Sequence, residues 1–414
     1  MALPPSSSPS VRWFTFTTFA EALGDQMART LAPILAVSLL GAGTAAVGLL
    51  HSLGLGMFLL LSIPLGLLGD RLSLPTAMMA TSTVLRMTVI ACGVLIWALG
   101  GLEGTTGIGI LLGIMLVIGI ADVVYTTGRS ILVPRLVPAD QIRPTMGRVQ
   151  TAAQIGTVLA PVALTALLAL AAPPLAWVGA ALAYLASALT QGRLREHDRA
   201  AGPTSASRYA RRPSRFRDGI CHLLAEPTLR RVTASSALYN AAVMAANTLL
   251  PVIALTELHL SPAVFTGIGS LGAVAGIIGA AAASRITARY GLRAVRISAA
   301  LTTGTGVLLI LLMTTDSAPL PGPVAIWIGI FYALSGLCTS VSAVAGADLI
   351  ARLCPPEMLG AVAGAQRTAT MGIMPVSALL IGLLGTLLGT TIATSVWLVL
   401  ALAAAIPCFR LQEK

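Results

Sequence analysis

The stretch VPRLVPADQIRPTMGRVQTA at residues 133–152 returns in modified form as IARLCPPEMLGAVAGAQRTA at residues 350–369. The offset, from residue 133 to residue 350, is 217 residues. A second pair, GLLGDRL at 66–72 and SRITARYGLRAV at 284–295, keeps an offset of 218. Nearly equal offsets at two separate places indicate that the chain consists of two related halves. The identical positions of the first pair are Arg135 and Arg352, Leu136 and Leu353, Pro138 and Pro355, Gly147 and Gly364, Thr151 and Thr368, and Ala152 and Ala369.

The composition indicates a membrane protein. Of the 414 residues, 56% are hydrophobic and 10% are charged, whereas soluble domains carry about a quarter charged residues. The apolar runs are long and do not alternate with polar residues, which favours membrane-spanning helices over barrel strands. The net charge of +11 does not indicate nucleic-acid binding, because the arginines lie between apolar runs rather than on an amphipathic surface.

The apolar runs predict twelve transmembrane helices in two pseudo-symmetric six-helix bundles, an all-α integral membrane fold. Two parallel repeats of this kind are typical of alternating-access transporters. We expect an N-terminal bundle at residues 1–191, a basic linker at 192–230 and a C-terminal bundle at 231–414. The expected spans are roughly 13–40, 44–69, 74–100, 105–131, 145–172, 174–191, 231–255, 262–286, 292–314, 323–350, 359–387 and 390–409.

Along the chain, connections that contain basic residues alternate with connections that contain none. The short turns at 41–43, 101–104, 173, 256–261, 315–322 and 388–389 contain no Lys or Arg, and the other connections contain many. The positive-inside rule therefore predicts that both termini are cytoplasmic. Within the linker, residues 214–226 look amphipathic, with Phe216, Ile220, Leu223 and Leu224 able to share a face. This segment is either a helix on the inner leaflet or a plain topogenic linker.

Three charged residues of the first span share one helix face. Glu21, Asp25 and Arg29 are spaced four residues apart, and residues at this spacing are neighbours on a helix. Ionisable residues at membrane depth are expensive and usually functional. Glu21 and Asp25 are therefore candidates for binding the coupling proton, with Arg29 modulating them. The alternative is an ion-pair ladder that holds the first span against a neighbour.

Two further charges lie within apolar spans. Arg86, midway along the third span, is either a counter-ion for an acid on another helix or a group that tunes the proton site. Asp122 lies in the inner half of the fourth span, and the family resemblance given below, which implies that the first, fourth, seventh and tenth spans surround the cavity, makes it a second candidate for the proton or for a cationic substrate. Tyr125 and Arg129 follow on roughly the same face, and Tyr125 is a candidate for lining the substrate cavity.

The second half offers polar candidates for substrate contact. Asn240 and Asn247 are seven residues apart in one span, and Tyr332 begins a polar stripe in another. Each can bind polar groups of a substrate, or it can form hydrogen bonds within the bundle.

Several kinds of chemistry are not indicated. The sequence has no G-x-x-x-x-G-K-[ST] motif, so an ATP-binding loop is not expected. It has no H-E-x-x-H or G-x-S-x-G motif and no metal-ligand spacing of Cys or His. We therefore expect no enzyme, no metal and no cofactor.

Two motifs resemble those of the major facilitator superfamily. The turn between the second and third spans resembles the family's G-x-L-x-D-R-x-G-R-R motif through Gly66, Leu68, Gly69, Asp70 and Arg71. The copy in the second half keeps Arg289, Tyr290, Gly291 and Arg293, but has Ala288 in place of the acid. The resemblance covers essentially the whole chain and implies a twelve-helix secondary transporter.

The fifth span resembles the antiporter motif of this family, which accompanies exporters. Gly147, Gly156 and Pro161 match the motif, and its other glycines are replaced. Ordinary packing of small residues around a proline kink explains the same residues. Patterns such as EPTLRRVTASSALYN at 226–240 are similar to the macrolide-efflux and enterobactin-exporter branch.

The resemblance implies proton-coupled efflux of an amphiphilic small molecule, such as an antibiotic, natural product or siderophore. The partners expected are this substrate, protons and the lipid bilayer, with no nucleic acid and a monomer as the working unit. The expected location is a bacterial cytoplasmic membrane. The alternatives are an importing symporter and a membrane sensor or scaffold that transports nothing.

The charged turn between the second and third spans yields a prediction. In the family this turn locks the two halves together, with the acid facing a cation such as Arg129 and the amides of span eleven. We expect Asp70→Ala to impair transport and Ala288→Asp to change it little, because only the first copy has its acid. Initial transport rates in vesicles check this expectation. Equal effects of the two changes would remove the gating role from Asp70.

Overall fold

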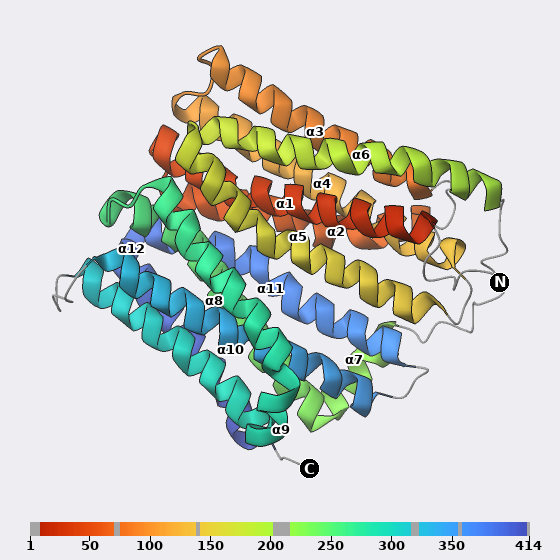
Figure 1. Ribbon diagram of the computed structural model, residues 1–414. Helices are drawn as coiled ribbons and strands as arrows, with labels where there is room; N and C mark the ends of the chain where they lie inside the picture. The colour runs from red at the N-terminus through yellow and green to blue at the C-terminus, as the bar shows by residue number, and fades with distance from the viewer. Residues whose placement is uncertain are drawn as a thin grey trace. The chain divides into compact units, whose positions relative to one another are not determined.

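The computed structural model describes residues 9–69, 75–137, 141–201, 216–315, 323–354 and 358–411. All regular structure in these ranges is helical (Figure 1). The first half contains α1 (Pro9–Leu40), α2 (Thr44–Gly69), α3 (Pro75–Ala98), α4 (Gly104–Leu136), α5 (Ile142–Leu170) and α6 (Ala176–Ala201). The second half contains α7 (Phe216–Ala225), α8 (Pro227–Val252), α9 (Pro262–Thr314), α10 (Val324–Leu353), α11 (Leu359–Leu388) and α12 (Thr390–Ala403). Short 3-10 or π turns occupy Pro173–Leu175, Ile253–Glu257 and Ile406–Arg410.

The helices confirm the expected all-helical membrane architecture. Ten helices of the described ranges are long and apolar enough to cross a membrane. The helix α9 counts once among them, although Gly291 interrupts its 53 residues with a φ of 76°. Its two arms correspond to the spans expected at 262–286 and 292–314. The helix α1 is not among the ten, and it is the helix that carries Glu21, Asp25 and Arg29.

The chain divides into two compact units. Unit 1 comprises residues 1–41 and 53–208, and unit 2 comprises residues 42–52 and 209–414. In unit 1, α1 packs against α4, α5 and α6, and α3 packs against α4 and α6. The run from Leu31 to Val37 of α1 is fully buried. Because α1 is surrounded by its neighbours, its charged side chains need partners on the helices around it.

Unit 2 has its own apolar core. Trp397 of α12 is fully buried against α8, α9 and α10 residues such as Leu249, Val307 and Phe331. The start of α2 also belongs to this unit. There the Ser52 hydroxyl donates to the Pro375 carbonyl at 2.7 Å. A side chain at Gly48 would lie 2.4 Å from the Ala378 carbonyl oxygen, so glycine is what permits this close helix contact.

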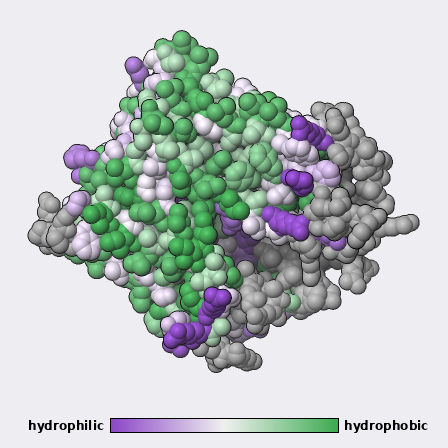
Figure 2. Space-filling view, in the orientation of Figure 1, coloured by the Kyte–Doolittle hydropathy of each residue, from purple (hydrophilic) through white to green (hydrophobic). Residues whose placement is uncertain are grey.

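The exterior is apolar, as a lipid-facing surface requires. Figure 2 shows hydrophobic residues over most of the coloured part of the visible face, with hydrophilic groups in a few places. Large side chains on the surface include Leu99, Leu170 and Leu387, which are 78%, 86% and 76% exposed. Exposed apolar patches on this scale are unusual in soluble monomers. The surface therefore agrees with the membrane class that the composition indicates.

The amphipathic segment of the linker forms α7, which is close to the expected 214–226. Its Leu223 is buried with Leu229 and Val362 beside α11. Ile220 and Leu224 are 38% and 52% exposed. This apolar stripe therefore packs on α11 at Leu223 and is exposed at Ile220 and Leu224. A role on the inner leaflet stays a prediction for the exposed pair.

Candidate functional site

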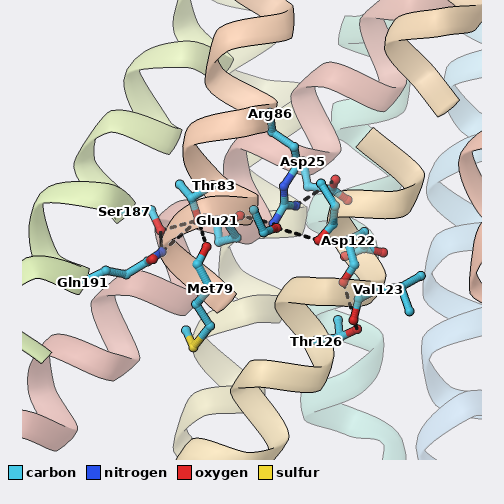
Figure 3. A network of polar contacts seen from close by, with 12 residues as sticks. Glu21, Asp25, Met79, Thr83, Arg86, Asp122, Val123, Thr126, Ser187 and Gln191 are labelled. Carbon is cyan, nitrogen blue, oxygen red and sulfur yellow. Dashed lines mark hydrogen bonds and ion pairs between the residues drawn. The ribbon is translucent and has the colours of Figure 1, made fainter. Parts of the chain in front are cut away.

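A network of charged residues lies inside unit 1, and Figure 3 shows it at close range. Glu21, Asp25 and Arg29 come from α1, Arg86 from α3 and Asp122 from α4. Four ion pairs connect these five residues. The network therefore joins the central helix to two of its neighbours.

Glu21 is held by side chains of two other helices, α3 and α6. Its carboxylate forms an ion pair with the Arg86 guanidinium. It also accepts hydrogen bonds from the Ser187 hydroxyl of α6 at 2.7 Å and from the Thr83 hydroxyl of α3 at 3.1 Å. Gln191 donates to both hydroxyl oxygens at 2.9 Å. Glu21 is 3% exposed, so this end of the network is enclosed, and both carboxylate oxygens of Glu21 have partners.

Arg86 is fully buried in the structure. Its guanidinium carbon lies 5.2 Å from the ring centres of both Tyr125 and Tyr184. It also faces the Asp25 carboxylate, with nitrogen and oxygen 3.4 Å apart. Aromatic faces attract a cation, most strongly where water is excluded. The two rings and two carboxylates together account for a buried arginine that would otherwise be very unfavourable.

Arg29 forms the other end of the network. Its Nε lies 2.7 Å from the Asp25 carboxylate on the same helix, and its Nη2 lies 3.3 Å from the Asp122 carboxylate of α4. Its Nη1 donates to the backbone carbonyl of Gly54 in α2 at 2.9 Å. Arg29 therefore connects α1, α2 and α4.

The ion pairs join three carboxylates to two guanidinium groups. The side chains of Asp25 and Asp122 are 22% and 32% exposed, whereas that of Glu21 is 4% exposed. Arg129 lies two helical turns beyond Asp122 on α4, about 10 Å away by helical rise. The directly paired groups thus carry one excess negative charge when all carboxylates are ionised.

Comparison with known proteins identifies the family. The family model for the Major Facilitator Superfamily matches residues 14–376. The chain belongs to the major facilitator superfamily. It is therefore a secondary transporter that crosses the membrane several times, and not an enzyme. No curated protein sequence matches it significantly.

Solved transporter structures share the fold over nearly the whole chain. The nucleoside transporter NupG superposes with a TM-score of 0.69 at 16% identity, covering 97% of this chain and 98% of that one. A bacterial homologue of the lysosomal transporter Spinster, inward-facing and unoccupied, gives 0.70 at 13% identity, with 97% of both chains covered. A POT family transporter in complex with 5-aminolevulinic acid gives 0.68 at 15% identity, with 96% and 94% covered. At these identities, the likeness establishes the fold.

The superfamily motif at the second turn is only partly described. Gly66 and Gly69 lie in the last turn of α2, while Asp70 and Arg71 lie outside the described residues. In the second-half copy, Gly291 has the positive φ of 76° that bends α9. Glycine adopts this backbone conformation readily, whereas other residues are strained there.

The arginines of the motif lie at or near the surface. Arg289 lies over the ring of Tyr290, 5.4 Å from its centre. Arg293 is exposed, and Arg129 is half-buried. Their gating role stays a prediction.

The antiporter-type motif of α5 has one member at a helix contact. A side chain at Gly156 would lie 2.5 Å from the backbone oxygen of Phe19, so Gly156 lets α5 approach α1 closely. Gly147 is exposed with open space around it. Pro161 lies inside α5. The geometry of Gly156 agrees with helix packing, which is one of the two interpretations of this motif.

The substrate candidates of the sequence belong to two different units. Tyr125 lies against Arg86 in unit 1, whereas the other three belong to unit 2. Asn240 donates to the Thr370 carbonyl at 2.8 Å, a bond between α8 and α11. The Asn247 backbone oxygen lies 3.1 Å from Nε2 of His51. Tyr332 packs edge-on against Phe331.

The sequence did not single out four residues that complete the network. Thr83, Ser187 and Gln191 surround Glu21, and Tyr184 covers Arg86. One signal was available, because Ser187 and Gln191 are four residues apart within an apolar span and therefore share a helix face. The hydroxyl of Thr83 gave no such signal, since isolated threonines are common in membrane helices.

Proposed function

We propose that this transporter exports an amphiphilic small molecule in exchange for protons. The observation that carries the proposal is the buried network of three carboxylates and two guanidinium groups around α1. The network has one carboxylate more than it has guanidinium groups. Within a membrane protein, this additional carboxylate provides a site that binds a proton and a cation in turn. Charged residues at this depth are retained where they serve the transport pathway.

Asp122 is the carboxylate best suited to exchange its proton. Among the described residues its ion pair is the contact with Arg29 at 3.3 Å, and its side chain is 32% exposed. Glu21 is enclosed by Arg86, Thr83 and Ser187. When Asp122 is protonated, Arg29 retains Asp25 as its partner at 2.7 Å. The network therefore accepts one proton without leaving either arginine unpaired.

Coupling between the proton and the substrate follows if both interact with the charge of Asp122. A proton on Asp122 removes the excess negative charge, and loss of the proton restores it. A ligand that interacts with this charge binds the two forms with different affinity, which is what a population shift between transport states requires. Export as the direction is supported by the antiporter-type residues Gly147, Gly156 and Pro161, whose resemblance was found in the sequence.

Accumulation assays test this function. A host lacking its major efflux pumps expresses the wild type, Asp122→Asn or Glu103→Gln, and takes up a panel of fluorescent amphiphiles. Glu103→Gln is the matched control, because it neutralises an exposed acid in the turn before α4. We expect lower accumulation of at least one amphiphile with the wild type and Glu103→Gln, and no reduction with Asp122→Asn. Unchanged accumulation of every compound contradicts export, and increased accumulation indicates import.

A further inference from the structure

A groove between α1 and α5 lies apart from the charge network. It has a volume of about 410 Å³ and is formed entirely by unit 1. None of the five ion-paired residues lines it. Its lining consists of Val11, Arg12, Thr15, Phe16 and Phe19 from α1, and of Arg148, Ala152 and Ile155 from α5.

The two helices contribute to the groove in the same register. On α1 the residues Arg12, Phe16 and Phe19 are spaced by four and three positions. On α5, Arg148, Ala152 and Ile155 have the same spacing. Residues at such spacing lie on one face of a helix. Each helix therefore lines one wall of the groove with an arginine followed by two apolar residues.

The arginines stand at the same end of the groove in the predicted topology. Both helices begin on the side that the positive-inside rule makes cytoplasmic, because odd-numbered spans of the first half run in one direction. Arg12 lies in the first turn of α1 and Arg148 in the second turn of α5. Phe19 and Ile155 lie about 10 Å deeper by helical rise. The groove is thus cationic at the membrane surface and apolar farther in.

None of the described residues that line the groove is acidic, and its apolar part is accessible. Arg12 and Arg148 are exposed, and Phe16 and Ile155 are 45% and 48% exposed. A third cation lies nearby, since the Arg193 guanidinium of α6 stacks 4.2 Å from the ring centre of Trp13. Guanidinium groups bind phosphate oxygens through paired hydrogen bonds. This end of unit 1 is therefore complementary to an anion with a hydrocarbon tail.

We propose that the groove binds an acidic phospholipid of the cytoplasmic leaflet. The lipid phosphate lies between Arg12 and Arg148, and one acyl chain follows Phe16, Phe19 and Ile155. A free phosphate ion would use only the arginines, and a zwitterionic lipid would bring its own cation to them. This site is separate from the proposed proton exchange. Its occupant contacts α1 at Phe19, two residues before Glu21, so binding is expected to stabilise unit 1.

Native mass spectrometry of the full-length protein tests the site. Detergent-purified protein is titrated with phosphatidylglycerol or with phosphatidylcholine of the same acyl chains, for the wild type and for the double variant Arg12→Gln/Arg148→Gln. The control Arg217→Gln/Arg285→Gln removes two exposed arginines outside the groove. We expect about tenfold preference for phosphatidylglycerol in the wild type and the control, and a preference below about twofold in the groove variant.

Two further measurements separate the alternatives. Ile155→Asp places a carboxylate in the apolar part, and we expect it to weaken phosphatidylglycerol binding although both arginines remain. A thermal-unfolding series with inorganic phosphate is expected to leave the melting temperature unchanged, while phosphatidylglycerol raises it. Equal loss in the groove and control variants overturns the proposal in favour of general charge. Equal stabilisation by phosphate overturns it in favour of a free-anion site, and unchanged binding in both groove variants overturns it outright.

Discussion

Replacing Arg86 with methionine is expected to lower the free energy of unfolding of the protein by about 3–5 kcal/mol, because it leaves a buried carboxylate without its partner. Arg86 is fully buried and pairs with both Glu21 and Asp25. Methionine is of similar length but supplies no charge. Glu21, which is 3% exposed, would then keep only the hydroxyl groups of Thr83 and Ser187. The loss therefore reflects an unpaired charge more than a lost contact.

A double-mutant comparison separates these effects. Unfolding in detergent is measured for Arg86→Met, Glu21→Gln and the combined Glu21→Gln/Arg86→Met variant. We expect the combined variant to recover much of the stability lost in Arg86→Met, because the amide of glutamine carries no charge. Arg217→Met, at an exposed arginine of α7, is the control and is expected to change little. A loss in Arg86→Met no larger than in this control would contradict the buried pairing.

The charged face of α1 shows what sequence spacing can predict. Four-residue spacing placed Glu21, Asp25 and Arg29 on one face, and the structure places Asp25 and Arg29 in contact at 2.7 Å. Spacing within one helix cannot predict partners on other helices. Glu21 pairs with Arg86 of α3, and Arg29 reaches Asp122 of α4, because α4 packs on α1 and α3 packs on α4 and α6. Those contacts are long-range consequences of the fold.

Helix boundaries were predicted better than connections. Hydropathy places most helices within a few residues, because each run must match the thickness of the bilayer. The exception is the connection near Gly291, where one glycine with positive φ bends α9 without an intervening loop. A composition window cannot detect such a bend.

Replacing Asp122 with asparagine is expected to uncouple transport from the proton gradient. Asparagine has nearly the same shape and keeps a carbonyl oxygen for Arg29, which lies 3.3 Å from the carboxylate in the wild type. It cannot bind or release a proton. The half-exposed position of Asp122 means that no fully buried charge is stranded by this change. We therefore expect the variant to fold and to move substrate in both directions without concentrating it.

The size of this effect follows from the energy of the gradient. One pH unit is worth about 1.4 kcal/mol per proton, which sustains about a tenfold gradient of substrate for one proton exchanged. In proteoliposomes with the membrane potential clamped at zero, the wild type should reach that ratio, and Asp122→Asn should stay near one. Exchange of labelled for unlabelled substrate should persist in the variant, because it needs no net proton movement. Asp25→Asn is the matched comparison on the same ion-pair chain. Arg29 binds both carboxylates, but only the carboxylate that titrates can convert the proton gradient into a substrate gradient. If Asp122→Asn reaches a tenfold substrate ratio and Asp25→Asn does not, the proton is therefore assigned to Asp25.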